Sequence, residues 1–346
     1  MLARVDVLTD VLAALKTGPT LCVRTEAFQP WGLRFGGNQG FGFHVIVQGS
    51  CRLVSAGEAP LALGVGDVVL LASGKEHTLA DKPSTPGVTF RLDDVEHNDS
   101  LLVHRYRAGA APRAAADSHP GADTVLLSGA YRLEPLRPHP LLAMLPDLVH
   151  VRSRRQLGLH TVVDLLGAEV EQREPGAAAI VSSLVDTLLI YILRAWQHDH
   201  PTGWSRAMAD PVIGPSLDRI HRDPAWPWTV ELLASAAGLA RATFTRRFTG
   251  LIGEPPLTYV TRWRMITAAR ILRQQDVPLA AVALQVGYTS EFAFARAFKR
   301  HYGQPPGSYR RAAAPRLLPI SETCWHQTTS ASSSRVGHPR SWRRRE

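Results

Sequence analysis

Apolar residues recur with two different periods along this chain, and the change between them divides it. Between about residues 20 and 135 they form short β-branched runs separated by glycine-containing turns, as in 42–53 and 66–77. Several short strands at this spacing predict a small barrel or sandwich. From Pro140 onward the apolar positions follow the helical period instead. The pattern predicts an α+β multidomain protein in which a β-barrel with a helical extension precedes an all-helical part.

The segment 180–196 carries the most regular helical stripe. Its apolar side chains recur every three or four residues, starting from Val181, Leu184 and Val185 and continuing to Ile192, which is the pattern of an amphipathic helix. Two interpretations are open: the stripe packs against its own domain, or it forms a seam between two copies of the chain. Taken alone, the periodicity favours packing within the domain.

Composition marks the boundaries between these parts. The stretch 198–215 holds three prolines and two glycines and is interpreted as a linker. Beyond Ala312 the sequence is rich in Ser, Thr, Pro and Arg without any period, so we expect disorder and a weak attraction to nucleic acid. The predicted division is a first domain at 1–200 (barrel about 20–135, helices about 140–197), a linker at 201–214, a helical domain at 215–311 and a basic tail at 312–346.

The positive charge lies in the back half of the chain. The 346 residues carry a formal net charge of +9. Residues 1–120 have a net charge of −1 and residues 121–214 of −2, whereas residues 215–311 have +8 and residues 312–346 have +4. A neutral front and a strongly basic back predict that only the back half meets a polyanion.

Two further features predict a cytoplasmic protein. No stretch approaches the ~20 uncharged apolar residues of a membrane span, and the helical pattern at the N-terminus contains Asp6 and Asp10, unlike a signal peptide. The three cysteines, Cys22, Cys51 and Cys324, are far apart and lack the spacing of zinc ligands or of a disulfide framework. We therefore expect no membrane contact and no structural metal.

The helical domain contains an internal repeat. At an offset of 50 residues the matching pairs are Phe244 with Phe294, Arg246 with Arg296, Phe248 with Phe298, Gly253 with Gly303, Pro255 with Pro305, Pro256 with Pro306, and Tyr259 with Tyr309. Upstream the offset is 49, so Gly238 matches Gly287 and the turn of the second copy is one residue longer. This many shared positions indicates two copies of one supersecondary unit.

Each copy follows the sequence pattern of a helix-turn-helix motif. Thr229 and Ser290 stand where helix caps are expected, a turn glycine follows the first helix, and phenylalanines lock the second. The other face of each second helix carries arginine, which in a single copy is most often a solvated face. Two copies with an arginine two residues after the core phenylalanine favour reading of the DNA major groove. The arginines are Arg241, Arg246 and Arg247 in the first copy and Arg296 and Arg300 in the second.

Between the copies, 257–275 is predicted to be one helix that starts at Pro255 and Pro256. At 1.5 Å per residue its length is roughly 28 Å, which is close to the ~34 Å between successive major-groove segments on one face of DNA. We call the second helix of each copy a reading helix. We expect the connecting helix to hold the two reading helices in adjacent grooves, so that one chain reads two half-sites.

The segments WTVELLASAAGLARATFTRRF, LTYVTRWRMITAARIL and VALQVGYTSEFAFARAFKRHYGQPPGSYRR resemble the DNA-binding domain of the AraC/XylS family of bacterial transcription regulators, over about 217–311. The resemblance implies that the residues facing the bases are Ala242, Thr245 and Arg246 in the first copy and Glu291, Phe292, Ala295 and Arg296 in the second. The residues expected at phosphates or at the helix start are Arg241, Arg247, Ser290, Lys299 and Arg300. RNA polymerase is an implied further partner.

Three positions depart from the family pattern. Ala240 stands where a Ser or Thr cap is common, so the first reading helix lacks roughly 0.5–2 kcal/mol of capping. Ala242 and Ala295 have no hydrogen-bonding side chain, and their only base contact would be to a thymine methyl group.

The front half, over about residues 1–200, resembles the cupin-type sensor domain often joined to such regulators. WGLRF, GFHVIVQGSCRL, GDVVLLASGKEH, TVLLSGAYRLE and PLLAMLP carry this likeness. The resemblance implies a small-molecule effector and strengthens the interpretation of 180–196 as a homodimer seam. The expected lining of an effector pocket in the barrel mouth is Trp31, Phe43, His44 and His77.

An alternative is a metal-dependent cupin enzyme whose C-terminal domain targets it to DNA. A catalytic metal needs three or four ligands on one inner face. Here only His44 and His77 stand at suitable positions, Val45 and Ile46 follow His44, and no glutamate lies within the next ten residues. We therefore expect no metal, no cofactor and no enzyme. A third interpretation is an RNA-binding or architectural protein. The helix-turn-helix repeat lacks the aromatic stacking platform that single-stranded RNA requires.

Overall fold

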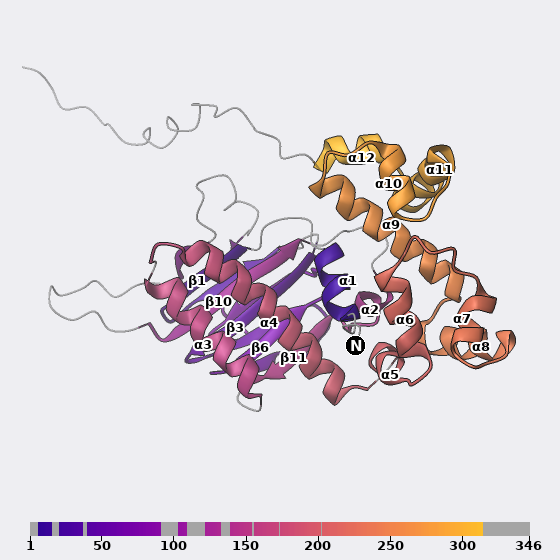
Figure 1. Cartoon of the computed structure of the whole chain (residues 1–346). Helices are drawn as coiled ribbons and strands as arrows, with labels where there is room; N and C mark the ends of the chain where they lie inside the picture. The colour runs from indigo at the N-terminus through magenta and orange to yellow at the C-terminus, as the bar shows by residue number, and fades with distance from the viewer. Residues whose placement is uncertain are drawn as a thin grey trace, which may run out of the picture.

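The computed structural model describes residues 6–15, 21–36, 40–90, 103–108, 122–132, 139–153, 156–172, 174–201 and 203–313 (Figure 1). Almost all of the predicted basic tail lies outside these residues. The described chain has a β-rich body followed by a helical part, which is the α+β order predicted from the two apolar periods.

Two sheets pack face to face in the β-rich body. The six-stranded sheet has the order β11 (Leu148–Arg152), β6 (Asp67–Leu71), β3 (Gly40–Gln48), β10 (Thr124–Arg132), β1 (Leu21–Ala27) and β9 (Val103–Ala108). The five-stranded sheet has the order β5 (Leu61–Gly64), β4 (Ser50–Ser55), β7 (His77–Ala80), β2 (Gly32–Phe35) and β8 (Val88–Phe90). Neighbouring strands are antiparallel except for the β1–β9 and β2–β8 pairs. Strand β11, which pairs with β6, lies in a region predicted to be wholly helical.

Side chains of successive residues alternate between the two faces of each strand. On β3, His44 and Ile46 point between the two sheets, whereas Phe43 and Val45 join the core on the other face. That second core is covered by α1 (Val7–Leu15), α2 (Pro140–Ala143), α3 (Leu157–Gln172) and α4 (Ala177–Asp199). Figure 1 shows α3 and α4 lying across the six-stranded sheet.

Helix α4 contains the regular stripe of 180–196. Val181, Val185, Leu188 and Ile192 are fully buried in the core of their own chain, and the hydroxyl of Tyr131 donates a hydrogen bond of 2.7 Å to the Val185 carbonyl. The stripe therefore packs within the domain and is not available as a seam between copies. By length and composition alone α4 could cross a membrane, but eight of its residues are buried here, as in the core helix of a globular domain.

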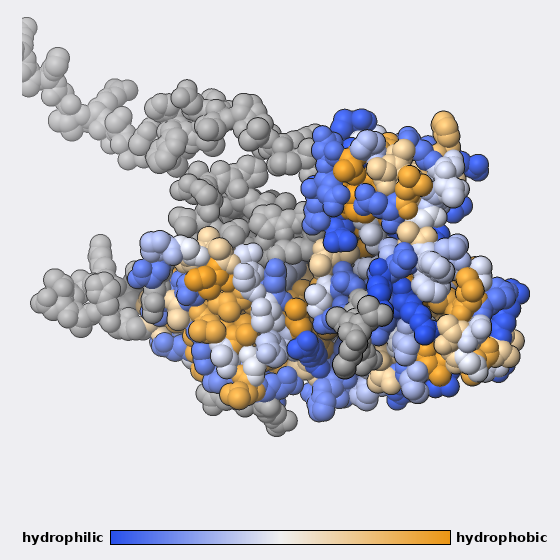
Figure 2. All heavy atoms as spheres, in the orientation of Figure 1, coloured by the Kyte–Doolittle hydropathy of each residue, from blue (hydrophilic) through white to orange (hydrophobic). Residues whose placement is uncertain are grey.

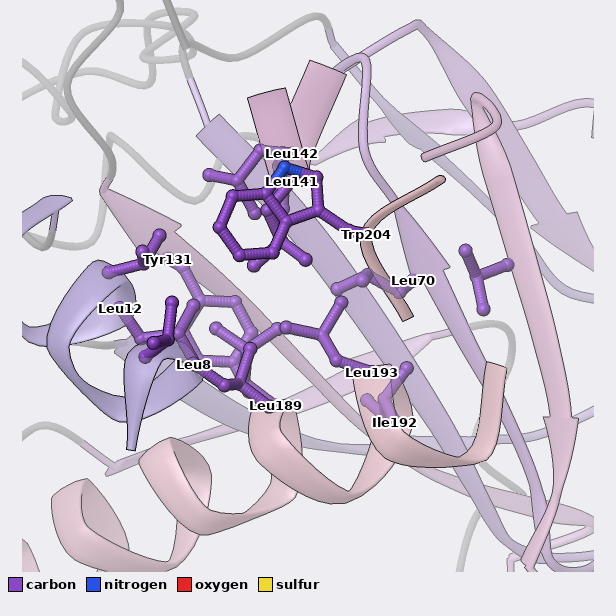
Figure 3. Packing of buried hydrophobic residues seen from close by; sticks show 14 of the residues in the cluster. Leu8, Leu12, Leu70, Tyr131, Leu141, Leu142, Leu189, Ile192, Leu193 and Trp204 are labelled. Atoms are coloured by element: carbon purple, nitrogen blue, oxygen red, sulfur yellow. The ribbon is translucent and has the colours of Figure 1, made fainter. Parts of the chain in front are cut away.

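The segment predicted as a linker contains helix α5 (Gly203–Ala209). Trp204 is buried and lies beside Leu141 and Leu142 of α2 (Figure 3). The prolines of this segment lie before a helix or in its first turn and so do not interrupt it. Pro211 lies between α5 and α6 (Ile213–Arg222), and Pro215 occupies the first turn of α6, where a missing N–H costs no helical hydrogen bond. Composition alone predicts an irregular segment because it counts the prolines without regard to where they lie relative to the helices.

The remaining helices build the repeated part of the chain. They are α7 (Val230–Ala236), α8 (Arg241–Ile252), α9 (Pro256–Gln274), α10 (Leu279–Gln285), α11 (Glu291–Tyr302) and α12 (Pro306–Ala313). One apolar core runs from the outer face of the six-stranded sheet through α1–α6 into α7, α8 and the first half of α9. The second half of α9 shares a separate core with α10–α12. The first repeat unit is thus built into the body, while the second has its own core.

Candidate DNA-binding surface and barrel interior

The two predicted helix-turn-helix units are present. Helices α7 and α8 are joined by residues 237–240 and helices α10 and α11 by residues 286–290, so the second turn is one residue longer, as the change of offset predicted. The turn glycines Gly238 and Gly287 have φ of +66° and +80°, a left-handed conformation that glycine adopts without steric cost.

The helix caps also follow the sequence. The Thr229 hydroxyl accepts a hydrogen bond of 3.1 Å from the Leu232 N–H at the start of α7. The Ser290 hydroxyl accepts one of 3.4 Å from the Ala293 N–H at the start of α11. Ala240 is the N-cap of α8 and has no side chain to do the same. The first reading helix therefore lacks the cap that the second possesses.

Equivalent aromatic pairs anchor the two reading helices. Phe244, Phe248, Phe294 and Phe298 are all fully buried. The Tyr259 ring meets Phe248 edge-on at 5.8 Å, and its repeat partner Tyr309 meets Phe298 edge-on at 5.3 Å. These edge-to-face contacts, together with the burial of the phenylalanines, fix which side of α8 and of α11 faces inward. Figure 1 shows α7 and α8 near one end of α9 and α10 and α11 near the other.

The opposite faces of α8 and α11 are open to solvent. Of the residues expected to face bases, Ala242, Arg246, Glu291, Phe292 and Arg296 are exposed, and Thr245 and Ala295 are half-buried. Phe292 is 85% exposed, more than any other large apolar side chain among the described residues. Arg246 and Arg296, at equivalent positions, form no ion pair with any described residue.

The residues expected at phosphates behave differently from one another. Lys299 and Arg300 are exposed and make no ion pair within the described part of the chain. Arg241 pairs with Glu231 of α7 at 2.8 Å. Both of these side chains are largely exposed, so the pair is weak and easily exchanged for a phosphate.

Arg247 departs from the expectation. Its Nε and Nη2 donate hydrogen bonds of 3.0 and 2.7 Å to one carboxylate oxygen of the nearly buried Asp210. Although burial acts to raise it, the pKa of Asp210 lies below its ordinary value because the Ile213 N–H and the Arg247 guanidinium stabilise the carboxylate. Arg247 thus links α8 to the start of α6. The sequence could not show this, because Asp210 is 37 residues away.

Inside the barrel, His44 and His77 belong to a chain of hydrogen bonds. The Nδ1 of His77 lies 2.9 Å from the Lys75 carbonyl and must donate to it. A neutral His77 then accepts at Nε2 from His44 Nε2, 2.8 Å away, and His44 Nδ1 accepts from the Ser128 hydroxyl at 2.7 Å. Burial lowers the pKa of both histidines, which agrees with two neutral rings.

The other two expected pocket residues lie on different faces of the six-stranded sheet. Trp31 is buried between the sheets, in the apolar cluster that surrounds the histidine pair. Phe43 does not join them: it packs on the other face of β3 against Tyr131, with ring centroids 5.3 Å apart. The expectation that Phe43 and His44 share a pocket is wrong, and the alternation along a strand was the signal that could have corrected it. Ser128 is the third member of this hydrogen-bonded chain, because strand β10 pairs it with His44. The sequence pattern did not single it out.

Within the described ranges, no group of three or more His, Cys, Asp or Glu side chains is placed to hold a metal ion. The paired ring nitrogens of His44 and His77 face each other across a hydrogen bond. The arrangement is that of a polar chain within an apolar interior.

Comparison with known proteins matches both halves of the chain. The cupin family profile matches residues 6–198, and the helix-turn-helix domain profile matches residues 233–312. A putative AraC-like transcription regulator of Streptomyces lividans is 34% identical over 312 residues, covering 88% of this chain and 98% of the relative. A second, of Streptomyces antibioticus, is 34% identical over 320 residues, covering 90% and 100%.

Among solved structures, the DNA-binding domain of AdpA in complex with a target DNA is 33% identical and covers 30% of this chain and 92% of its own, with a TM-score of 0.28. The alignments with the two Streptomyces relatives cover 88% and 90% of this chain, so they include residues of both of its domains. The chain therefore belongs to the family of AraC-like transcription regulators and is a DNA-binding transcription factor with a cupin-type N-terminal domain.

Proposed function

We propose that α8 and α11 read two successive major-groove segments of one DNA duplex, with Arg246 and Arg296 donating to guanine. The observation that carries this is the equivalence of the two arginines: each is exposed and two residues after a buried phenylalanine, on a helix whose inner face is fixed by an aromatic pair. Arginine is suited to donate two hydrogen bonds to the major-groove edge of guanine.

The other exposed residues have complementary parts. Phe292 and Ala295 offer apolar contact to thymine methyl groups, and Thr245 and Glu291 have polar groups for base edges. Arg241, Lys299 and Arg300 hold phosphates and set the salt dependence of binding. Ser290 keeps the start of α11 in place through its cap, and Arg247 acts by bracing α8.

The test is a binding titration of the full chain on its selected DNA site. Arg296→Ala is expected to cost about 1–3 kcal/mol on the preferred site and to relax the base preference at one position. Arg52→Ala, which removes an exposed arginine from strand β4, is the charge-matched control and should change little. An equal loss of affinity on all sequences would contradict base reading by Arg296.

We further propose that the outer face of α3 and α4 joins two copies of the chain. Leu157 and Leu165 of α3 and Ile180 of α4 are 83%, 50% and 44% exposed. Figure 2 shows apolar atoms gathered over the same two helices. Large apolar side chains grouped on a surface mark contact sites. A dimer would carry two pairs of reading helices and would gain affinity from their linkage.

We place effector control in the barrel and activation through RNA polymerase, in the cytoplasm. The support for an effector site is the polar chain of His44, His77 and Ser128 within an apolar interior.

We propose no enzymatic activity, and metal analysis of the purified chain tests this: iron or manganese near one equivalent per chain would favour the cupin enzyme instead. The division into 1–200, 201–214 and 215–311 is also part of the proposal, with α5 packed on the body.

A further inference from the structure

The loop between α6 and α7, residues 223–228, makes contacts outside its own helix-turn-helix unit. Arg264 of α9 donates from Nε to the Pro224 carbonyl and from Nη2 to the Trp226 carbonyl, both at 2.8 Å. The same guanidinium lies over the ring of Tyr288, 5.9 Å from its centroid. Tyr288 belongs to the turn of the second unit, so one arginine side chain contacts both units.

The backbones of the two units also touch. A Cβ added at Gly287 would lie 2.7 Å from the carbonyl oxygen of Ala225, 2.9 Å from its Cα and 2.9 Å from Nη2 of Arg264. Backbone atoms cannot be moved aside as the end of a flexible side chain can. Any residue other than glycine at this turn would therefore force the loop 223–228 away.

The first unit has no such contact at the equivalent position. Gly238 has a similar left-handed φ, yet a Cβ added there would meet nothing within 4 Å. The helix-turn-helix turn therefore does not itself require close approach. The contact at Gly287 is a property of how the two units sit against each other.

The loop is stiff enough to transmit this contact. The Trp228 indole donates a hydrogen bond of 2.8 Å to the Asp223 carbonyl, and the Asp223 carboxylate accepts one of 3.0 Å from the Trp226 N–H. Pro224 and Pro227 restrict the backbone further. Arg264 is half-buried, and burial lowers its pKa, so its two carbonyl acceptors and the Tyr288 ring replace the water it has lost.

We infer that Arg264 and Gly287 are positioning residues that fix the angle between α8 and α11, and with it the half-site spacing that the protein accepts. Each unit packs on its own half of α9, so a bend or twist of α9 between the two halves would change the angle between the units. The loop 223–228 supplies a second point of contact between the units, which resists such a bend or twist. This inference rests on the proposed reading of two groove segments by α8 and α11.

A direct test measures the distance between the reading helices. Spin labels at Thr243→Cys and Ala293→Cys, which are exposed equivalent positions, are introduced into the full chain with Cys324→Ser; Cys22 and Cys51 are buried. We expect Arg264→Ala to broaden the distance distribution, Gly287→Ala to shift it, and Gly238→Ala to leave it unchanged. A distribution in Arg264→Ala with the parent's mean and width would overturn the inference.

A DNA test measures the consequence. Affinity is determined on the selected site and on versions with one base pair added or removed between the half-sites. Wild type should favour the original spacing, and Arg264→Ala should reduce that preference by about tenfold, because a pre-organised reader loses less on binding the correct spacing. Arg264→Lys retains the charge but not the fork of two donors, and should lie between them.

The outcomes separate this inference from the proposed function. If wild type shows no sequence preference on duplex DNA, the proposed function fails. If wild type is specific and folded Arg264→Ala keeps the same spacing preference, only the positioning role fails. Should Arg264→Ala prove unfolded, the comparison of Gly287→Ala with Gly238→Ala, together with Arg264→Lys, decides the matter.

Discussion

The hydroxyl of Tyr259 lies 2.6 Å from Nε2 of His221 inside the junction between the β-rich body and the reading helices. The same hydroxyl lies 3.1 Å from Nε2 of His139, which precedes α2 of the body. The Leu141 N–H donates to Nδ1 of His139, so a neutral His139 donates from Nε2 to Tyr259, and Tyr259 donates in turn to His221. Nδ1 of His221 then faces Asp10 of α1 at 3.6 Å.

This junction predicts a dependence of stability on pH. Burial, followed by the nearby His221 and Arg262, holds the pKa of His139 well below its ordinary value. Burial also lowers the pKa of His221, with Asp10 opposing it. Because both pKa values are lower in the folded chain, their contribution is fully present above the unfolded value of about 6.5 and is lost as pH falls below it. The loss is at most about 1.4 kcal/mol per pH unit for each histidine.

Thermal unfolding at pH 7.5 and pH 5.5 measures this effect. The melting temperature of wild type should fall with acid more steeply than that of His139→Gln, which cannot be protonated. His198→Gln, at an exposed position on α4, should retain the wild-type slope. Equal slopes in wild type and His139→Gln would show that the junction does not sense protons.

A serine at position 240 should stabilise the first reading helix. Ala240 has the extended backbone of an N-cap but no side-chain acceptor, so in Ala240→Ser the new hydroxyl can accept from the Thr243 N–H. The expected gain in the free energy of unfolding is about 1 kcal/mol, measured by urea denaturation. Ser290→Ala is the matched control in the second unit and should lose a similar amount. An Ala240→Ser chain that is no more stable than wild type would contradict the capping deficit.

Alanine substitutions of Arg247 and Lys299 should affect different properties: the first the stability of the chain, the second its binding to DNA. Arg247→Ala removes the two hydrogen bonds to Asp210 and is expected to lower the free energy of unfolding by roughly 1 kcal/mol. Lys299→Ala removes the same charge from an exposed site and should leave stability unchanged while reducing the salt slope of DNA binding by about 1. If Arg247→Ala changed the salt slope as much as Lys299→Ala, the phosphate role expected from the sequence would stand.

The proposed dimer face can be tested by a single charge. Leu165→Asp puts a carboxylate into the apolar face of α3 and should convert a dimer to a monomer in sedimentation experiments. Val88→Asp, at a 64% exposed position on the edge strand β8, is the matched control and should leave the mass unchanged. A wild-type chain that sediments as a monomer at all concentrations would remove the basis for the face.

The sequence by itself determined the parts of this protein whose order is local or repeated. The 50-residue offset, the caps at Thr229 and Ser290 and the exposed Arg246 and Arg296 could all be predicted, because capping and helical faces depend on residues within about four positions. The helix-turn-helix units were therefore found together with their longer second turn. Phe43 could have been placed correctly from alternation alone.

Only the tertiary structure decided how these parts meet. The Tyr259 hydroxyl joins histidines 38 and 120 residues away, Arg247 reaches Asp210, and the turn at Gly287 rests on Ala225. No local pattern encodes such pairings, because a buried polar group can be satisfied by any partner that the fold brings within hydrogen-bond distance. The Pro- and Gly-rich linker likewise contains α5 because Trp204 and Ala207 are buried in a core shared with the body, which composition alone does not predict.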